Sequence, residues 1–397
     1  MKRWMMAAAL IVVCAAGALM IVLQPSAPLK TPQAGETLLS AAQGLDEIVI
    51  DAVFDPAAQT LTVAQTFTLQ NSTGSPQAAL VLRSYAAAMR DEANAPSATE
   101  ELHSLSYPAG FSAGGIEIIS PALSYYYEDD AQTVLIVALD SVWQSGEQLT
   151  LRLAYTLDIP DAAYRLGASG GIYAFGNAFL IPAYEADGEY FTAPYYSIGD
   201  PFVSVCRNYT VRVTVPPGYT AAGSGTAEVD GQTTTFTALA SRDFALSIGK
   251  EYRRAEALQG GVLLRAYAKT HKDADEMLAI AQKAMRVYAS LFGAYPYPCF
   301  TLAEIGLPFD GMSYPSFAMI ASDTLRKDDE GREIRIAREI AKQWFQAVAG
   351  SDNYRQPWQH EALAEYALLR YWEEIHGAAA REALQYSRVD TAMRLYV

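Results

Sequence analysis

The chain has 397 residues, a length that favours two or three domains over one. Of its residues, 51% are hydrophobic and 18% are charged, so it can bury a large core and does not have the composition of a disordered protein. Its formal net charge of −15 argues against a nucleic-acid partner, which would require a basic face. An acidic balance does not by itself indicate a basic substrate, because it is commonly a solubility feature.

The N-terminus has the pattern of a membrane anchor. Lys2 and Arg3 precede an uncharged apolar run over residues 4–23, which is long enough to cross a bilayer as a helix. A cleavable signal peptide is the alternative, but the bulky end of the run and Pro25 make a poor cleavage site. We therefore expect residues 1–23 to be an uncleaved signal anchor and transmembrane helix. The chain would be a single-pass protein of the cell membrane with its bulk extracytoplasmic.

The next part of the sequence has β character. Residues 24–44 are rich in Pro, Ala and Gly without an apolar period, which is typical of a linker. Between residues 45 and 253, segments rich in β-branched residues lie between Asn, Gly, Asp and Pro turns. We expect strands near residues 61–69, 79–83, 133–139, 148–155, 209–215 and 244–248. Many short strands favour an N-terminal β domain of sandwich or saddle shape over 45–253.

The pattern becomes helical in residues 254–397. Helices are expected at 273–292, 330–349 and 357–376, with a short strand near 300–307. Asp328 or Asp329 could cap the second helix, and Pro357 suits the first turn of the third. The chain ends inside a helical pattern, so we expect a domain that is truncated at its C-terminus.

One helix carries a motif with a chemical meaning. Arg338 and Lys342 are four residues apart and share a helix face, with Glu339 about 100° round from Arg338. This is the spacing of HExxH, in which two histidines hold zinc and the glutamate acts as general base. Here both histidine positions hold cations. Eighteen residues then separate Lys342 from Glu361 on the next helix.

Four motifs together resemble the M1 (aminopeptidase N-like, gluzincin) zinc peptidases. They are REIAKQWF at 338–345, HEALAEY at 360–366, FGAYPYP at 292–298 and FDGMSYP at 309–315. Their order and spacing match that family, and residues 199–202 and 209–222 resemble the end of its N-terminal β domain. The resemblance implies a multidomain β plus α fold. It would consist of an M1-type β-sandwich or saddle domain followed by a partial thermolysin-like α+β domain.

The resemblance also assigns roles to positions in this sequence. The zinc-ligand positions are Arg338, Lys342 and Glu361, and Glu339 matches the general base. The substrate-binding strand corresponds to Gly311, Met312, Ser313 and Tyr314, where Ser313 replaces the glutamate that recognises a free amino terminus. Ser316 replaces a glycine that follows this strand. The transition-state tyrosine of the family is expected beyond Val397, so no residue here takes that role.

Two basic side chains in place of two ligands oppose zinc binding. At an effective dielectric of about 20, unit charges 4 Å apart interact by about 4 kcal/mol, so Zn²⁺ between two cations faces about 16 kcal/mol of repulsion before any side chain moves. Structural zinc sites with all their ligands bind by only about 10–16 kcal/mol. Metal coordination also lowers the pKa of water by an amount worth roughly 12 kcal/mol, which Glu339 alone cannot supply. We therefore expect no zinc cofactor and no peptide hydrolysis by the family mechanism.

The retained glutamates suggest why these cations are present. We expect Arg338 and Lys342 to supply the positive charge of the missing ion and to pair with Glu361, and also with Glu339. The alternative is that both cations face solvent in an open cleft. Glu365 would be either a neighbour that supports this site or half of an ordinary pair on the helix surface.

Other candidate residues carry weaker signals. Of the four histidines only His360 is near this site, and no second histidine at helical spacing completes a substitute metal site. Cys206 and Cys299 are more simply two independent thiols than a disulfide. The tyrosines at 125–127 and 195–196 could line a peptide-binding surface or pack at strand edges.

These observations favour a membrane-anchored M1 peptidase-like protein that is catalytically inactive, a pseudopeptidase. Its partners would be a peptide or protein ligand in the cleft and the membrane, through the N-terminal helix. The alternative is an active metallo-aminopeptidase-type hydrolase with a non-standard metal site. A third possibility is a decayed product without activity of its own.

Overall fold

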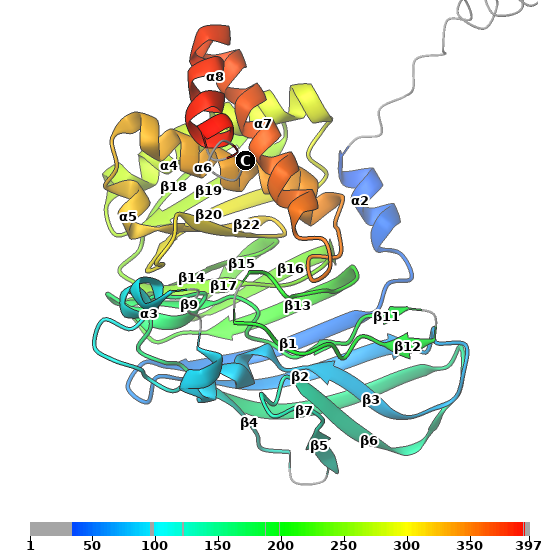
Figure 1. Cartoon of the computed structure of the whole chain (residues 1–397). Coiled ribbons are helices and arrows are strands. Elements are labelled where there is room, and N and C mark those ends of the chain that lie inside the picture. Colours follow the sequence, from blue (N-terminus) through cyan, green and yellow to red (C-terminus); the bar gives the residue numbers. More distant parts are fainter. Residues whose placement is uncertain are drawn as a thin grey trace, which may run out of the picture.

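The computed structural model describes residues 34–95, 99–120, 123–186, 188–197, 199–391 and 393. Within this part, helices cover a mixed sheet, and further sheets are stacked beneath it (Figure 1). The expected anchor at 1–23 lies outside the described residues. Among the helices that are described, none is both long enough and apolar enough to cross a membrane.

The largest sheet has seven strands in the order β15-β16-β13-β1-β2-β7-β4. Its longer strands form because apolar residues alternate with polar ones: in β2 (Thr60–Gln70) and β13 (Arg207–Thr214), every second side chain is buried. All neighbouring pairs are antiparallel except β1 with β13. The other strands are β1 (Glu47–Asp55), β4 (Gly115–Ile118), β7 (Gln148–Asp158), β15 (Thr226–Asp230) and β16 (Thr233–Ser241).

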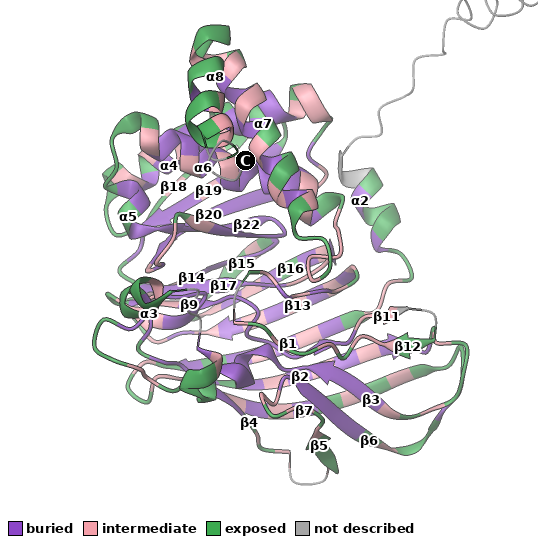
Figure 2. Ribbon diagram, viewed as in Figure 1, coloured by how far each residue is buried: buried purple, intermediate pink, exposed green. Residues whose placement is uncertain are grey.

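Two four-stranded sheets and a short strand pair complete the β-rich part. The first sheet is β10-β3-β6-β5, formed by β3 (Gln77–Arg83), β5 (Tyr125–Tyr127), β6 (Val134–Trp143) and β10 (Ile181–Pro182). The second is β14-β17-β9-β8, formed by β8 (Leu166–Ser169), β9 (Ile172–Phe175), β14 (Tyr219–Gly223) and β17 (Leu246–Lys250). The short pair is β11 (Glu185–Ala186) with β12 (Glu189–Tyr190). This part also contains the helix α3 (Glu100–Ser106) and two 3₁₀ helices, Tyr85–Arg90 and Glu92–Asn94. One apolar core joins the three sheets and accounts for the buried strand centres in Figure 2.

The C-terminal part contains a five-stranded sheet in the order β18-β19-β20-β22-β21. Every residue of β20 (Cys299–Ile305) and β22 (Phe317–Ala321) is buried, as expected for parallel strands covered on both faces. The remaining strands are β18 (Arg253–Gln259), β19 (Val262–Ala268) and β21 (Gly311–Tyr314), and β21 is an edge strand. The helices α4 (His271–Phe292), α5 (Ser322–Leu325), α6 (Asp329–Lys342), α7 (Trp358–His376) and α8 (Ala378–Gln385) belong to the same part. Side chains of α4, α6 and α7 share an apolar core with this sheet.

The stretch 24–44, which we expected to be an irregular linker, differs from that expectation in its second half. Residues Ala34–Ala42 form helix α2. Leu38 and Ala42 are one turn apart and are both buried in the core of the C-terminal part. The Asn208 side chain donates a hydrogen bond to the Ala42 carbonyl, which satisfies one of the free carbonyls at the helix end. The helix is therefore stabilised by tertiary packing that the local composition does not reveal.

The helix expected at 330–349 is also not uniform. It is α-helical only as far as Lys342 and continues as a π-helix over Gln343–Val348. Gln343 is fully buried at the start of this segment, where its Oε1 accepts from Ser316 N and Tyr295 Oη and its Nε2 donates to the Tyr314 carbonyl. A second π-helix, Tyr386–Asp390, follows α8. Wider turns of this kind are rare and commonly lie beside functional sites.

Candidate functional site

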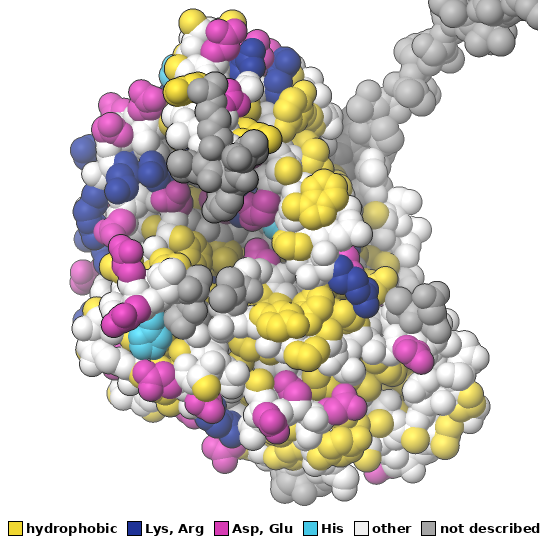
Figure 3. All heavy atoms as spheres, in the orientation of Figure 1, with side chains coloured by type: hydrophobic (Ala, Val, Ile, Leu, Met, Phe, Trp, Pro, Cys, Tyr) yellow, Lys and Arg dark blue, Asp and Glu magenta, His cyan; other side chains and the backbone are white. Residues whose placement is uncertain are grey.

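A cleft of about 1130 Å³ lies where α6 and α7 face the β-rich part, and it is open to solvent. On the helix side it is lined by Arg338, Glu339, Lys342, His360 and Glu361. The opposite side includes Tyr164, Arg165 and Asp200, the segment before β21 contributes Phe309, and β21 itself contributes Met312. Figure 3 shows the molecule hollowed on this face, with acidic side chains inside the hollow and hydrophobic side chains along its rim.

The start and the apolar face of α6 position its charged residues. The Asp328 side chain caps the helix by accepting from Gly331 N at 2.9 Å, as the sequence predicts. Ile336 and Ile340, one turn apart, are fully buried in the core, which fixes the rotation of the helix. Arg338 and Lys342 therefore point together from the other side toward the start of α7.

Four side chains form a compact charge cluster, which we define as Arg338, Glu339, Lys342 and Glu361. Lys342 Nζ lies 3.0 Å from Glu361 Oε1 and 3.4 Å from Glu339 Oε1. Arg338 Nη2 donates to Glu361 Oε2, and Arg338 Nη1 lies 3.4 Å from Glu339 Oε1. The expected pairing of the two cations with both glutamates is confirmed. The alternative, that they face solvent, is wrong for Lys342, whose side chain is only 8% exposed.

The charges in this cluster stabilise one another. Burial alone would lower the pKa of Lys342, but Glu339 and Glu361 beside it raise that pKa above its ordinary value. Burial alone would raise the pKa of Glu361, but the contact with His360 and the charges of Lys342 and Arg338 hold it well below its ordinary value. Lys342 is therefore protonated and Glu361 ionised at neutral pH.

Glu365 extends the cluster along α7. Its Oε2 accepts from Arg338 Nε at 3.0 Å, and Arg388 donates to both of its carboxylate oxygens. Glu365 thus supports the orientation of Arg338 instead of forming an isolated pair on the helix surface.

The edge strand β21 lies against α6 through its four residues at 311–314. A Cβ added at Gly311 would lie 2.8 Å from Glu339 Cγ and 2.9 Å from the Met319 carbonyl oxygen, so only glycine fits there. Ser313 is buried, and its Oγ lies 2.7 Å from the Glu339 carbonyl oxygen and 3.0 Å from Glu339 Oε2, so it can donate to either. Met312 lines the cleft, whereas the hydroxyl of Tyr314 is directed to Asn177.

Ser316 follows this strand with a φ of +55°, a conformation that favours glycine. Its backbone N–H donates to Gln343 Oε1, and its hydroxyl accepts from Gly225 N at 2.7 Å. The two hydrogen bonds hold a non-glycine residue in a left-handed turn. They also join this turn to the π-helix that follows α6 and to the β-rich part.

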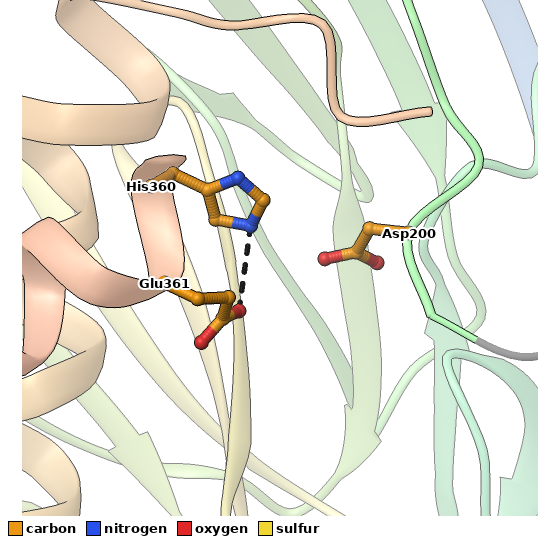
Figure 4. Close-up of side chains that lie close together, drawn as sticks. All are labelled: Asp200, His360 and Glu361. Atoms are coloured by element: carbon orange, nitrogen blue, oxygen red, sulfur yellow. Dashed lines mark ion pairs between the residues drawn. The ribbon is translucent and has the colours of Figure 1, made fainter. Parts of the chain in front are cut away.

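A second group of side chains lies next to the charge cluster. Asp200, His360 and Glu361 place one possible metal-ligand atom each within 4.8 Å of the others (Figure 4). His360 is only 1% exposed, and neither ring nitrogen has a hydrogen-bond partner among the described residues, although Nε2 lies 3.3 Å from Glu361 Oε1. Asp200 also accepts from Arg165 Nη1 at 2.8 Å. Burial alone would raise the pKa of Asp200, but Arg165 lowers it below its ordinary value.

Neither arrangement fits a divalent metal ion. Of the three positions that the resemblance assigns to zinc ligands, Arg338 and Lys342 are cations. Both already bind the third, Glu361. In the second group, Lys342 lies 3.0 Å from Glu361 Oε1 and Arg165 lies 2.8 Å from Asp200 Oδ1. A divalent ion about 4 Å from a unit positive charge is opposed by roughly 8 kcal/mol at an effective dielectric of 20. At both places the protein's own cations already neutralise the carboxylates.

Other predicted residues lie outside this centre. Cys206 and Cys299 are free thiols. The exposed tyrosines of β5 lie on an edge strand in the β-rich part, whereas Tyr196 stacks on Tyr354 with 5.4 Å between ring centroids. No sequence motif identifies Arg165 or Asp200 as a site residue. Only the resemblance at 199–202 pointed toward Asp200, and no local pattern marked Arg165.

The comparisons with known proteins agree with this architecture. No family profile and no curated sequence matches the chain. Among solved structures, a variant of an M1 zinc metallopeptidase from Deinococcus radiodurans matches with a TM-score of 0.56 and 18% identity over 87% of this chain and 75% of that chain. The same enzyme without the substitution matches with a TM-score of 0.54, 18% identity and 87% and 74% of the two chains. A variant of this enzyme bound to a Tyr-Ser-Ala substrate matches with a TM-score of 0.55 and 18% identity, over 88% of this chain and 76% of that chain.

The chain therefore has the mixed β and α fold of M1 zinc metallopeptidases. The resemblance expected from the four motifs is confirmed at the level of the fold. These structural neighbours are zinc metallopeptidases, which agrees with the zinc that the motif resemblance implies for the family.

Proposed function

We propose that this protein is a catalytically inactive M1-like peptidase that binds a peptide or protein segment in its cleft. The observation that carries the proposal is the charge cluster. Arg338 and Lys342 occupy the positions of two metal ligands and bind Glu361, the third, as well as Glu339. A site whose own cations neutralise its carboxylates has neither room nor charge for Zn²⁺.

The state of Glu339 supports the absence of hydrolysis. This residue matches the general base, but its side chain is only 3% exposed and contacts Arg338, Lys342 and Ser313. A base must reach the proton that it abstracts, and the Glu339 carboxylate is already engaged by both cations and by Ser313. Without a metal, the water that it would activate keeps the high pKa of bulk water.

We also propose a role for each of the other parts of the chain. We assign the strand at 311–314 to contact with the bound segment, since β21 is an edge strand next to α6 and its residues Gly311 and Met312 line the cleft. Residues 45–253 are the N-terminal β domain and 254–397 the thermolysin-like domain, with the cleft between them. Residues 1–23 anchor the chain in the cell membrane, and 24–44 connect the anchor to the extracytoplasmic part.

An assay of the full chain in detergent tests the proposal. A panel of fluorogenic aminoacyl and endopeptidase substrates should show no turnover above buffer, with or without added zinc. Turnover that a chelator abolishes and that disappears in Glu339→Gln would contradict it.

A hydrolase with a non-standard metal site is the second candidate. It is favoured by one observation, the grouping of Asp200 and Glu361 with His360, a buried imidazole whose ring nitrogens make no hydrogen bond to the described residues. If this candidate were right, the purified chain would contain a transition metal that is lost in both His360→Ala and Asp200→Ala. We expect no such metal, because Lys342 and Arg165 already bind the two carboxylates.

A further inference from the structure

The acidic residues that line the cleft already have basic partners. This holds for each one among the described residues. The pairs are Glu339 and Glu361 with Arg338 and Lys342, Asp200 with Arg165, and Asp310 with Arg335. The ammonium group of a peptide N-terminus requires a carboxylate partner when it leaves water. In this cleft it would have to displace an arginine or lysine from an existing ion pair.

The cleft has three Arg or Lys side chains, and each is held in one of these ion pairs. Arg338, Lys342 and Arg165 all line it. An amine that enters the cleft must therefore compete with these cations for the same carboxylates. The neutral Ser313 does not offset this, because its hydroxyl is buried against Glu339.

The groups that remain available in the cleft are uncharged or apolar. Tyr164 and Phe309 pack edge to face with 5.9 Å between centroids, and Leu102, Met312 and Pro357 extend this apolar lining. Ser106 contributes a buried hydroxyl that has no hydrogen-bond partner among the described residues. Such a surface suits apolar side chains and neutral peptide groups, with a few polar atoms to fix orientation.

We propose that the cleft selects an internal or N-terminally blocked peptide segment with apolar side chains and discriminates against a free amino terminus. This inference rests on the proposed peptide-binding function and names its ligand class. The physical basis is that an acetylated or internal residue has no charged amino group that must lose its hydration. It can use the apolar lining without breaking an ion pair of the protein.

Two probes that differ only at the amino terminus test the inference. The tripeptide Tyr-Ser-Ala and its N-acetyl form are titrated into the full chain in detergent by calorimetry at pH 7. The acetylated form should bind about ten-fold or more tightly, a factor that corresponds to removal of one unfavourable charge interaction. Equal or tighter binding of the free amine would overturn the inference and leave peptide binding intact. If neither form bound at millimolar concentration, the proposed peptide-binding function itself would be contradicted.

Two variants change the preference in a defined direction. Lys342→Met removes one partner of Glu339 and Glu361, so the free-amine form should gain affinity relative to the acetylated form. Arg335→Ala frees Asp310 at the exposed margin of the cleft and should have a smaller effect of the same sign without disturbing buried contacts. An unchanged ratio of the two affinities in both variants would contradict the role assigned to the paired carboxylates.

Discussion

The ammonium group of Lys342 is buried between two carboxylates, 3.0 Å from Glu361 Oε1 and 3.4 Å from Glu339 Oε1. Lys342→Met removes this charge and leaves Arg338 to neutralise both glutamates. Breaking a buried pair in this way costs about 3–5 kcal/mol, because an uncompensated charge stays in a poorly solvated place. We expect a loss of that size in the free energy of urea-induced unfolding.

Lys283→Met is the matched control for this experiment. Lys283 also pairs with a glutamate, Glu333, at 3.5 Å, but its side chain is 46% exposed. Its removal should change the free energy of unfolding by less than about 1 kcal/mol. A change within 0.5 kcal/mol for Lys342→Met as well would show that the cluster does not stabilise the fold.

Asp243 gives the stability a pH dependence that can be measured. Burial raises the pKa of this carboxyl to about 7, although hydrogen bonds from Phe244 N and Asn177 oppose the rise. The unfolded chain releases the same proton near pH 4, so between roughly pH 4 and 7 the folded protein binds more protons. The free energy of unfolding should therefore fall as pH rises through this window, by at most about 1.4 kcal/mol per unit, and level off above it.

The variant Asp243→Asn removes that proton uptake. The slope of unfolding free energy against pH, measured between about pH 5 and 7, should become less negative in the variant. An identical slope in the two proteins would mean that Asp243 is ionised in the folded state at pH 5.

At the scale of elements, Gln343 connects the π-helix to the strand that forms the cleft wall. Its amide satisfies Tyr295 Oη, Ser316 N and the Tyr314 carbonyl, all of which are buried. Gln343→Leu keeps the approximate volume but leaves these three groups without a partner. We expect a loss of about 3 kcal/mol in chemical denaturation.

Gln346→Leu provides a control in the same π-helix. The Oε1 of Gln346 is buried without a hydrogen-bond partner among the described residues, so replacing this amide should cost less than about 1 kcal/mol. Equal losses in the two variants would indicate that the segment responds to any substitution and that the Gln343 hydrogen bonds are not specific.

Much of the element pattern can be predicted from local sequence, and particular elements show where this fails. The alternation in β2 and the period of α4 are local properties, so the expected 61–69 and 273–292 agree closely with Thr60–Gln70 and His271–Phe292. Helix α2 was missed because its stability comes from Leu38 and Ala42 packing on a distant core. The π-helix was missed because it depends on three tertiary hydrogen bonds of Gln343, which no helical period reveals.

At the scale of the whole molecule, one apolar cluster joins the two parts of the chain. It combines residues of the β14-β17-β9-β8 sheet, such as Ile172 and Ala174, with Ile305 and Met319 of the five-stranded sheet. Because separating the parts would expose this cluster, we expect them to unfold together. Far-UV circular dichroism and tryptophan fluorescence should give one coincident transition in urea. Two resolved transitions would contradict this coupling.

The packing of the whole molecule also explains which site residues could be predicted from the sequence. Arg338, Lys342 and Glu361 could be identified because two adjacent helices carry them at fixed spacing. Asp200 lies 160 positions before His360 in the sequence and reaches it only through the packing of the β-rich part against α7. Arg165 joins the site through its ion pair with Asp200. Contacts of this kind are set by the assembled fold, so sequence spacing cannot indicate them.

The zinc content of the full chain most directly tests the claim that the protein's cations replace the metal ion. The wild type and the double variant Arg338→His, Lys342→His are equilibrated with zinc and dialysed, and bound metal is measured by mass spectrometry. The double variant should retain about one zinc per chain, because it presents two imidazoles and Glu361 at the spacing of a tetrahedral site. The wild type should retain none. A stoichiometric transition metal in the wild type, lost in Glu361→Ala, would contradict the account.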